Sequence, residues 1–216
     1  AIENDADAAA TYRRNLGVPV VEADLAVCGE FPDVDVVVAG PPSEGLNALG
    51  EHGAARKSNT FTEEFLRVLT SARPPVFVYE NVAPLLRSPE YETLCETARL
   101  LGYGVEGRVL NAADYGVPQT RKRAVVIGVF GRKASFPAAT HVDPLLRDLT
   151  TLEMPPWRNV RDAIGDLSHT PDGRDWHVAR TPTPQSRERY AFIPPGGNRF
   201  DQIGRASCRE RVCYVV

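Results

Sequence analysis

Residues 34–39 read VDVVVA and stop at Gly40-Pro41-Pro42, and residues 76–79 read VFVY and stop at Glu80. Both runs are rich in β-branched and aromatic residues, and the first is typical of a strand buried on both faces of a parallel sheet. Between them, the apolar residues of 65–69 follow the spacing of one helix face. A strand, a helix and a second strand in this order predict a parallel α/β unit.

The same alternation continues on both sides of this unit. Asn4 or Asp5 is placed to cap a helix that Gly17 would end, and Ser88-Pro89 with Gly102 brackets another helix. The remaining predicted elements are a helix opened by a capping box at Thr60 and Glu63, strands over 20–22, 103–110 and 124–129, and a helix over 160–167. We therefore expect an α/β fold with a doubly wound sheet.

The chain has 216 residues, of which 43% are hydrophobic and 25% are charged, which is ordinary for a globular protein. It contains no apolar run of about 18 residues and does not open with the basic-then-apolar layout of a secretory signal. Its four cysteines share no CxxC spacing and form no metal tetrad with the four histidines. We expect a soluble, cytoplasmic protein without a membrane span, a metal site or a disulfide framework.

The net charge of −3 hides an asymmetry along the chain. Residues 1–118 hold 9 Lys and Arg against 18 Asp and Glu, whereas residues 119–216 hold 16 against 10. An acidic first part and a basic second part suit a core that binds a small molecule, followed by a surface that meets a polyanion. Surface charge that is uneven without any function is the alternative explanation.

Three predicted strand ends carry chemically unusual residues, namely Glu3, the turn 40–44 and the triplet Glu80-Asn81-Val82. Ligands of open parallel sheets bind outside the carboxyl ends of the strands, so we expect these three ends to converge on one site. A carboxylate in the position of Glu3 typically accepts hydrogen bonds from ribose hydroxyls. A surface glutamate near the terminus is the alternative for Glu3 taken alone.

Three ordered blocks carry a resemblance to a known family. They are VVVAGPPSEGLN at 36–47, PPVFVYENVAPLL at 74–86 and LNAADYGVPQTRKRAVVIG at 110–128. With these blocks in this order, the chain resembles the cytosine-5 DNA methyltransferases. The resemblance implies a Rossmann-like methyltransferase sheet, S-adenosylmethionine as the cofactor and double-stranded DNA as the substrate. It also implies an internal fragment, which begins after the family's first strand and glycine-rich turn and ends before most of its target-recognition region.

In that family a cysteine thiolate adds to C6 of a flipped-out cytosine, and the resulting enamine takes the methyl group at C5. The resemblance places Ser43 at the nucleophile position and Glu80 as the acid that protonates or hydrogen-bonds N3. Arg121 and Arg123 are then the guanidinium groups that brace the base, the phosphodiester and the glutamate, although a solvated basic turn is the alternative for them. Residues 44–53 match the mobile loop that closes behind the flipped base.

The nucleophile position is where the chain departs most from the family, whose turn reads Pro-Pro-Cys. A cysteine with a pKa of about 8.5 supplies a few per cent of thiolate at neutral pH, whereas a serine hydroxyl is not ionised unless a base activates it. Glu44 is too weak a base for an alcohol, and His52 lies farther along the loop. We expect impaired turnover, and a subgroup that works with altered chemistry is the other interpretation of Ser43.

The resemblance also implies a set of cofactor contacts along the same strand ends. Glu3 is placed at the ribose, and Asn4 lies near the adenine, where the family usually has a large apolar residue. The remaining implied contacts are Asp24 and Leu25 around the adenine amino group and face, and Pro42 and Phe61 along the pocket wall.

Two other functions stay open at this point. One is a non-catalytic relative that binds DNA or cofactor because Ser43 has abolished methyl transfer, and the other is a tRNA cytosine-5 methyltransferase. An amino-methylating enzyme with the same Pro-Pro turn is disfavoured, because Gly40 and Ser43 flank the prolines and supply neither the acceptor nor the stacking ring of such enzymes. Further expectations are a monomer, a cognate restriction endonuclease as a partner and a location at the prokaryotic nucleoid.

The chain is expected to divide into three parts. Residues 1–136 form the catalytic core, and the proline-rich residues 137–202 form a connector toward the missing target-recognition region. Residues 203–216 read IGRASCRERVCYVV without apolar periodicity, and we expect them to be a non-native read-through tail. The connector segment with Arg180, Arg187 and Arg189 is expected to approach DNA phosphates.

Overall fold

The computed structural model describes residues 1–43, 54–167 and 181–194. The chain separates into two compact units, residues 1–165 and residues 166–216. No helix in the described parts is long and apolar enough to cross a membrane. The predicted boundaries after 136 and 202 stay predictions, and the predicted read-through tail lies outside the described residues.

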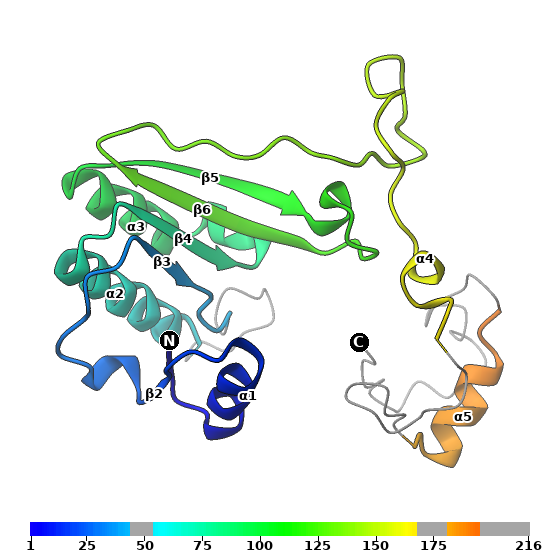
Figure 1. Ribbon diagram of the computed structural model, residues 1–216, viewed down its shortest axis with the longest axis horizontal. Coiled ribbons are helices and arrows are strands. Elements are labelled where there is room, and N and C mark those ends of the chain that lie inside the picture. Colours follow the sequence, from blue (N-terminus) through cyan, green and yellow to red (C-terminus); the bar gives the residue numbers. More distant parts are fainter. Residues whose placement is uncertain (44–53, 168–180, 195–216) are drawn as a thin grey trace. The chain divides into compact units, whose positions relative to one another are not determined.

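A four-stranded sheet dominates the first unit (Figure 1). Its strands stand in the order β3 (Val36–Ala39), β4 (Val76–Asn81), β6 (Lys122–Phe130) and β5 (Tyr103–Asn111). Strands β3 and β4 run parallel, whereas β6 is antiparallel to both of its neighbours. The alternation of strands and helices is the predicted α/β architecture, and the sheet is mixed rather than purely parallel.

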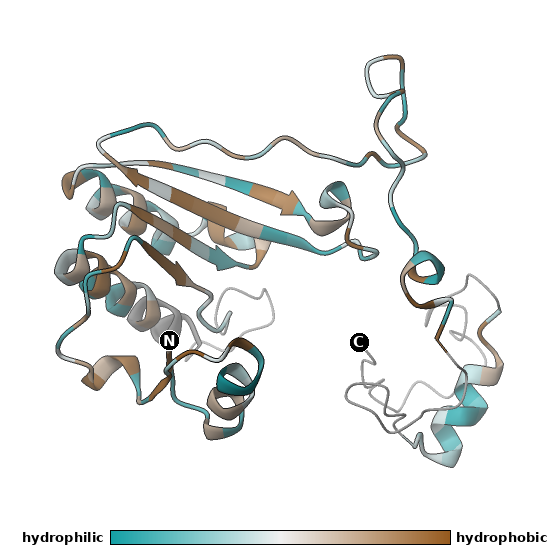
Figure 2. Cartoon of the chain, viewed as in Figure 1, coloured by the Kyte–Doolittle hydropathy of each residue, from teal (hydrophilic) through white to brown (hydrophobic). Residues whose placement is uncertain are grey.

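Two helices, α2 (Ala54–Ala72) and α3 (Pro89–Leu100), pack against one face of this sheet. Alternate residues of β4 are buried, because the side chains of a strand point to opposite faces in turn. Figure 2 shows apolar residues along β3, β4 and β6. The core cluster consists of Phe65, Leu66, Leu69, Phe77, Tyr79, Leu85, Leu94, Ala98, Tyr103, Ala124 and Val126.

A separate two-stranded sheet pairs β1 (Ile2–Glu3) with β2 (Val21–Glu22) in parallel. Helix α1 (Ala6–Leu16) connects the two strands. Asp5 caps its first turn, and Gly17 ends it with a φ of 64°, in the left-handed region that favours glycine. Both caps that the sequence predicts for this helix are confirmed, with Asp5 rather than Asn4 at the N-terminal position.

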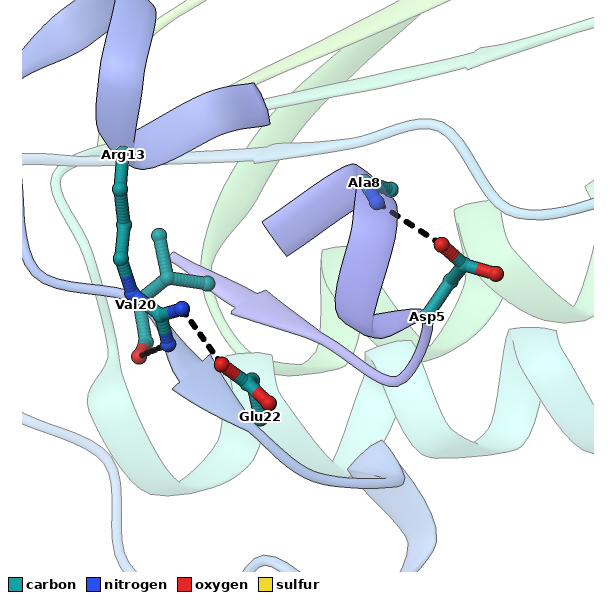
Figure 3. A network of polar contacts seen from close by, with 5 residues as sticks. All are labelled: Asp5, Ala8, Arg13, Val20 and Glu22. Atoms are coloured by element: carbon teal, nitrogen blue, oxygen red, sulfur yellow. Dashed lines mark hydrogen bonds and ion pairs between the residues drawn. The ribbon is translucent and has the colours of Figure 1, made fainter. Parts of the chain in front are cut away.

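Arg13 attaches helix α1 to strand β2 (Figure 3). Its guanidinium donates to the carbonyl oxygen of Val20 at 2.7 Å and also pairs with the carboxylate of Glu22. The strands themselves supply few ladder hydrogen bonds because each has two residues. The side chain of Arg13 therefore contributes a tie that the backbone of this small sheet lacks.

Short helices follow several strand ends. They are the 3₁₀ helices η1 (Leu25–Val27) after β2, η2 (Ala83–Arg87) after β4 and η3 (Ala112–Tyr115) after β5. Beyond β6 the first unit ends with α4 (Val160–Ile164), and the second unit contains α5 (Pro184–Ala191) among its described residues. The helix that the sequence predicts over 160–167 is therefore present and shorter than expected.

Two predictions about individual elements are wrong. Strand β3 is not buried on both faces, since Val36 and Val38 are 49% and 73% exposed and β3 pairs with β4 alone among the described strands. Helix α2 begins at Ala54, so Thr60 and Glu63 of the predicted capping box lie inside the helix rather than at its start. Thr62, inside the predicted box, is buried and shares a 3.2 Å hydrogen bond with the hydroxyl of Tyr79 instead.

Candidate functional site

Strands β3 and β4 bring the Pro-Pro turn beside Glu80. Their parallel register pairs Ala39 with Tyr79, so that Gly40 and Glu80 follow at the same level. A Cβ atom on Gly40 would lie 3.5 Å from Oε2 of Glu80. The backbone of the turn therefore passes close to the carboxylate at the carboxyl end of both strands.

Asn81 holds the turn in place. It occupies the last position of β4 that faces the core, and it is 3% exposed. Its Nδ2 donates to the carbonyl oxygen of Pro41 at 3.3 Å, and its Oδ1 accepts from the backbone N–H of Val82 at 2.7 Å. A buried amide with both ends bonded fixes the turn relative to the sheet.

The antiparallel strand β6 adds a guanidinium to the same place. The register pairs Glu80 with Val125 and Asn81 with Ala124, so Arg123 lies one residue beyond the last pair. Its Nε is 3.1 Å from Oε1 of Glu80, and the two side chains are 29% and 41% exposed. The ends of three strands thus meet at one edge of the sheet. There the carboxylate of Glu80 is accessible to solvent and is oriented by the guanidinium of Arg123.

The other two predicted catalytic residues lie nearby along the chain. Ser43 is half-buried in the same turn as Gly40 and ends the first described stretch. Arg121 is exposed, and its carbonyl oxygen accepts from the N–H of Ala112 at 2.9 Å. Within the described residues, the ion pair of Glu80 is with Arg123 and not with Arg121. The predicted closing loop, 44–53, lies outside the described residues.

Tyr79 lies on the opposite face of β4 from Glu80. Burial raises the pKa of its phenol, and the hydrogen bond shared with Thr62 acts in the opposite direction. The hydroxyl therefore stays protonated at physiological pH. This side chain supports the strand from the core side and adds no charge near Glu80.

The two-stranded sheet brings Glu3 and Asp24 to another edge. Strand β1 ends at Glu3, and the N–H of Ala23 donates to its carbonyl oxygen at 3.1 Å. Each carboxylate accepts one local backbone bond, Oε1 of Glu3 from Asp5 and Oδ1 of Asp24 from Ala26, both at 2.9 Å. No described residue donates to the second oxygen of either group, so both can accept from a ligand.

The remaining predicted cofactor residues lie in four different segments of the chain. Leu25 in η1 and Phe61 in α2 are half-buried, whereas Asn4 and Pro42 are exposed. Two carboxylates with partly buried apolar side chains suit a ligand that carries hydroxyl and amino donors on a flat ring. Among the described residues, no group of three or more His, Cys, Asp and Glu side chains is placed to hold a metal ion.

The structure gives roles to two polar residues that the sequence analysis did not assign to the site, Asn81 and Asp114. The sequence could have indicated the role of Asn81, because a polar residue at a core position of a strand needs a hydrogen-bond partner. Nε1 of Trp157 donates to Oδ1 of Asp114 in η3 at 2.9 Å. The sequence gives no local indication of this bond, since the two residues are 43 positions apart. This bond anchors the segment around Trp157 to η3.

Comparison with known proteins identifies the relatives of this chain. The family model for the C-5 cytosine-specific DNA methylases matches residues 1–191. The chain is 34% identical over 211 residues to the Type II methyltransferase M1.HphI of Haemophilus parahaemolyticus, which covers 88% of this chain and 53% of that protein. It is 32% identical over 224 residues to M.BspRI of Lysinibacillus sphaericus, covering 92% and 51%. The chain thus spans about half the length of the curated relatives it matches.

Solved structures share the fold. The Dnmt2 methyltransferase of S. pombe has a TM-score of 0.58 at 15% identity, covering 90% of this chain and 58% of that one. A DNA modification methyltransferase encoded within an E. coli prophage has a TM-score of 0.58 at 22% identity, covering 79% and 48%. These structures confirm the predicted methyltransferase fold class. The chain therefore belongs to the C-5 cytosine-specific DNA methylase family.

Proposed function

We propose that this chain carries the catalytic core of an S-adenosylmethionine-dependent DNA cytosine-5 methyltransferase whose turnover is impaired by Ser43. The observation that carries the proposal is the 3.1 Å contact between Arg123 and Glu80 beside the turn 40–43. An acid, a cation and a nucleophile position at one sheet edge are the groups that addition to a pyrimidine ring requires.

Glu80 and Arg123 have separate tasks in this proposal. When a nucleophile adds to C6 of cytosine, negative charge develops on the ring and reaches N3, where Glu80 holds or shares a proton. Arg123 keeps the carboxyl group in one orientation through its guanidinium, which a flexible ammonium does less well. Arg121, which is exposed two residues earlier, is assigned to the base or its phosphodiester.

The cofactor supplies the methyl group, which it carries on a sulfonium when bound. Glu3 is assigned to the ribose hydroxyls and Asp24 to the adenine amino group, because each carboxylate keeps one oxygen that no described residue engages. The other residues assigned to the cofactor are Asn4, Leu25, Pro42 and Phe61. The carboxylates of the chain fit this ligand, since they accept hydrogen bonds and the hydroxyl and amino groups of the ligand donate them.

Ser43 determines how far the reaction proceeds. A hydroxyl must lose its proton before it adds to C6, whereas a thiol with a pKa of about 8.5 is already partly ionised at neutral pH. We therefore expect binding of DNA and cofactor to outlast methyl transfer in this chain. This is also the observation that favours the second candidate, a non-catalytic relative that only binds.

The proposed partners follow from the names of the relatives and from the charge of the chain. Relatives named Type II methyltransferases favour double-stranded DNA as the substrate, a cognate restriction endonuclease as a partner and action at the nucleoid in the cytoplasm. Residues 119–202, without the predicted tail, carry 13 Lys and Arg against 9 Asp and Glu, which suits phosphate contacts. We propose a monomer for this encounter.

Covalent trapping tests the proposed reaction. The polypeptide that carries this chain is incubated with S-adenosylmethionine and a duplex that contains 5-fluorocytosine, which blocks release of the enzyme from C6. We expect Ser43→Cys to form at least about 100-fold more adduct than the chain with Ser43, because a thiolate replaces an un-ionised hydroxyl. The matched control is Ser135→Cys, at an exposed serine shortly after strand β6.

The outcomes separate the candidates. Adduct with the DNA duplex in Ser43→Cys supports the proposal. A shift of DNA mobility without any adduct in that variant supports the binding relative instead. Adduct with a fluorinated tRNA and none with DNA changes the substrate to RNA.

A further inference from the structure

The guanidinium of Arg67 joins helix α2 to the 3₁₀ helix η1, which lies about forty residues earlier in the chain. Its two terminal nitrogens donate to two backbone carbonyls of the η1 segment, those of Leu25 and Cys28. The same group lies over the ring of Phe31, 5.3 Å from the centroid. A planar fork that meets two carbonyls and an aromatic ring fixes both the distance and the orientation of the segment.

Little else holds η1 in place. It has three residues, none of them buried, and Val27 is 78% exposed, so apolar burial contributes little here. The cap from Asp24 to Ala26 and the 3.2 Å bond from the N–H of Cys28 to Leu25 shape the turn internally. Among the described residues, the side-chain hydrogen bonds that tie η1 to another element come from Arg67.

The charges around this contact also depend on Arg67. Glu64 lies one turn earlier on α2, and its pKa is raised by burial and then by the charge of Asp24, whereas Arg67 acts in the opposite direction. The three groups therefore lie within electrostatic reach of one another. Without Arg67, the repulsion between the carboxylates of Glu64 and Asp24 would lack the opposing charge of this cation.

We infer that Arg67 is a positioning residue for the adenine end of the cofactor. The inference rests on the proposed function, because it is there that Asp24 and Leu25 are assigned to the adenine amino group and face. Arg67 bonds to the backbone of η1 and acts on the ligand through Asp24. Its effect is therefore on recognition of the amino group rather than on the affinity for any nucleoside.

The ratio of the affinities for adenosine and inosine measures this effect, since inosine has an oxygen where adenosine has the amino group. Calorimetric titration of the full chain is expected to show at least about a tenfold preference for adenosine, the worth of a hydrogen bond to a charged group. Arg67→Met is expected to reduce the preference to about twofold or less, and Asp24→Asn to do the same. Arg67→Lys is expected to be intermediate, because an ammonium cannot form the fork.

Two further variants separate positioning from general damage. The double variant Arg67→Met with Asp24→Asn is expected to lose no more preference than either single change, because both act through one contact. Arg87→Met, at an exposed arginine of η2, is the matched control and is expected to keep the full preference. If Arg67→Met does not unfold cooperatively, Phe31→Leu replaces it, with an expected loss of about twofold.

The possible results have distinct meanings. An unchanged adenosine preference in folded Arg67→Met, or losses that add in the double variant, overturns the inference and leaves the proposed reaction intact. A natural chain that binds neither nucleoside overturns the inference together with the assigned cofactor residues. Adduct formation by Ser43→Cys still tests methyl transfer in that case.

Discussion

The two edges that carry the candidate site are built in different ways. The catalytic edge, with Glu80 and Arg123, stands on strands of six and nine residues in one sheet, and their register alone places the two side chains together. The cofactor edge, with Glu3 and Asp24, stands on two strands of two residues each. There the side chains of two arginines, one on α1 and one on α2, supply ties that the short strands lack. Long strands position residues through the backbone, whereas short strands depend on individual side chains.

The largest expected effect is at the catalytic edge. In the Ser43→Cys background, Glu80→Gln should lower the rate of adduct formation about 10²- to 10⁴-fold, because the proton at N3 is lost while the shape is kept. The rate is measured with the 5-fluorocytosine duplex in single-turnover mixing. The matched control is Glu106→Gln, since Glu106 on β5 also pairs with an arginine, Arg108, at 2.6 Å. A rate that both variants leave unchanged would contradict the assigned role of Glu80.

The second effect concerns the stability of the two sheets. Phe77 of β4 is fully buried, packs against Phe65 and Tyr103, and fills the space where Gly128 has no side chain. Phe77→Ala should therefore lower the free energy of unfolding by about 3–5 kcal/mol. Val21→Ala on β2, where the side chain is 56% exposed, should lower it by less than about 0.5 kcal/mol. Denaturant titration measures both, and equal losses would remove the distinction between the sheets.

The same distinction explains how much of the molecule the sequence could predict. The β-branched and aromatic run of β4 and the Ser88-Pro89 cap of α3 are local patterns, so this strand and the start of this helix were predicted correctly. The exposure of β3 was not predicted, because a β-branched run has the same sequence pattern in a central strand and in an edge strand. Arg67 was missed for a related reason, since its partners lie 42 and 39 residues away and leave no local signal.

Helix caps offer a smaller test of the comparison. Asp5 caps α1 and Ser88 caps α3, each by accepting a backbone N–H, and replacing either by alanine should cost about 1 kcal/mol. The consequences should differ, because α1 buries Ala9 alone whereas α3 buries Leu94, Cys95 and Ala98. Asp5→Ala should speed amide exchange within α1 and leave the large sheet protected. Ser88→Ala should lower protection throughout the sheet, and local loss confined to α3 would contradict this.

The smallest expected effect lies at the cofactor edge. Burial and the charge of Asp24 raise the pKa of Glu64, so its ionised form is less favourable in the folded chain than in the unfolded chain. The stabilising contribution of the protonated group is present in acid and is lost as the pH rises through the folded pKa. Glu64→Gln should therefore raise the free energy of unfolding at neutral pH, by less than about 0.5 kcal/mol because solvent screens a partly exposed group.

The pH dependence decides whether that gain has the proposed origin. The difference between Glu64→Gln and the natural chain should shrink as the pH falls and Glu64 becomes protonated. Glu63→Gln, at the exposed neighbour on α2, is the matched control. If Glu64→Gln is instead less stable at neutral pH, attraction to Arg67 outweighs burial and the repulsion from Asp24. The cofactor edge would then be held by an ion pair of Arg67 as well as by its two hydrogen bonds. It would resemble the catalytic edge more closely, where Glu80 and Arg123 also form an ion pair.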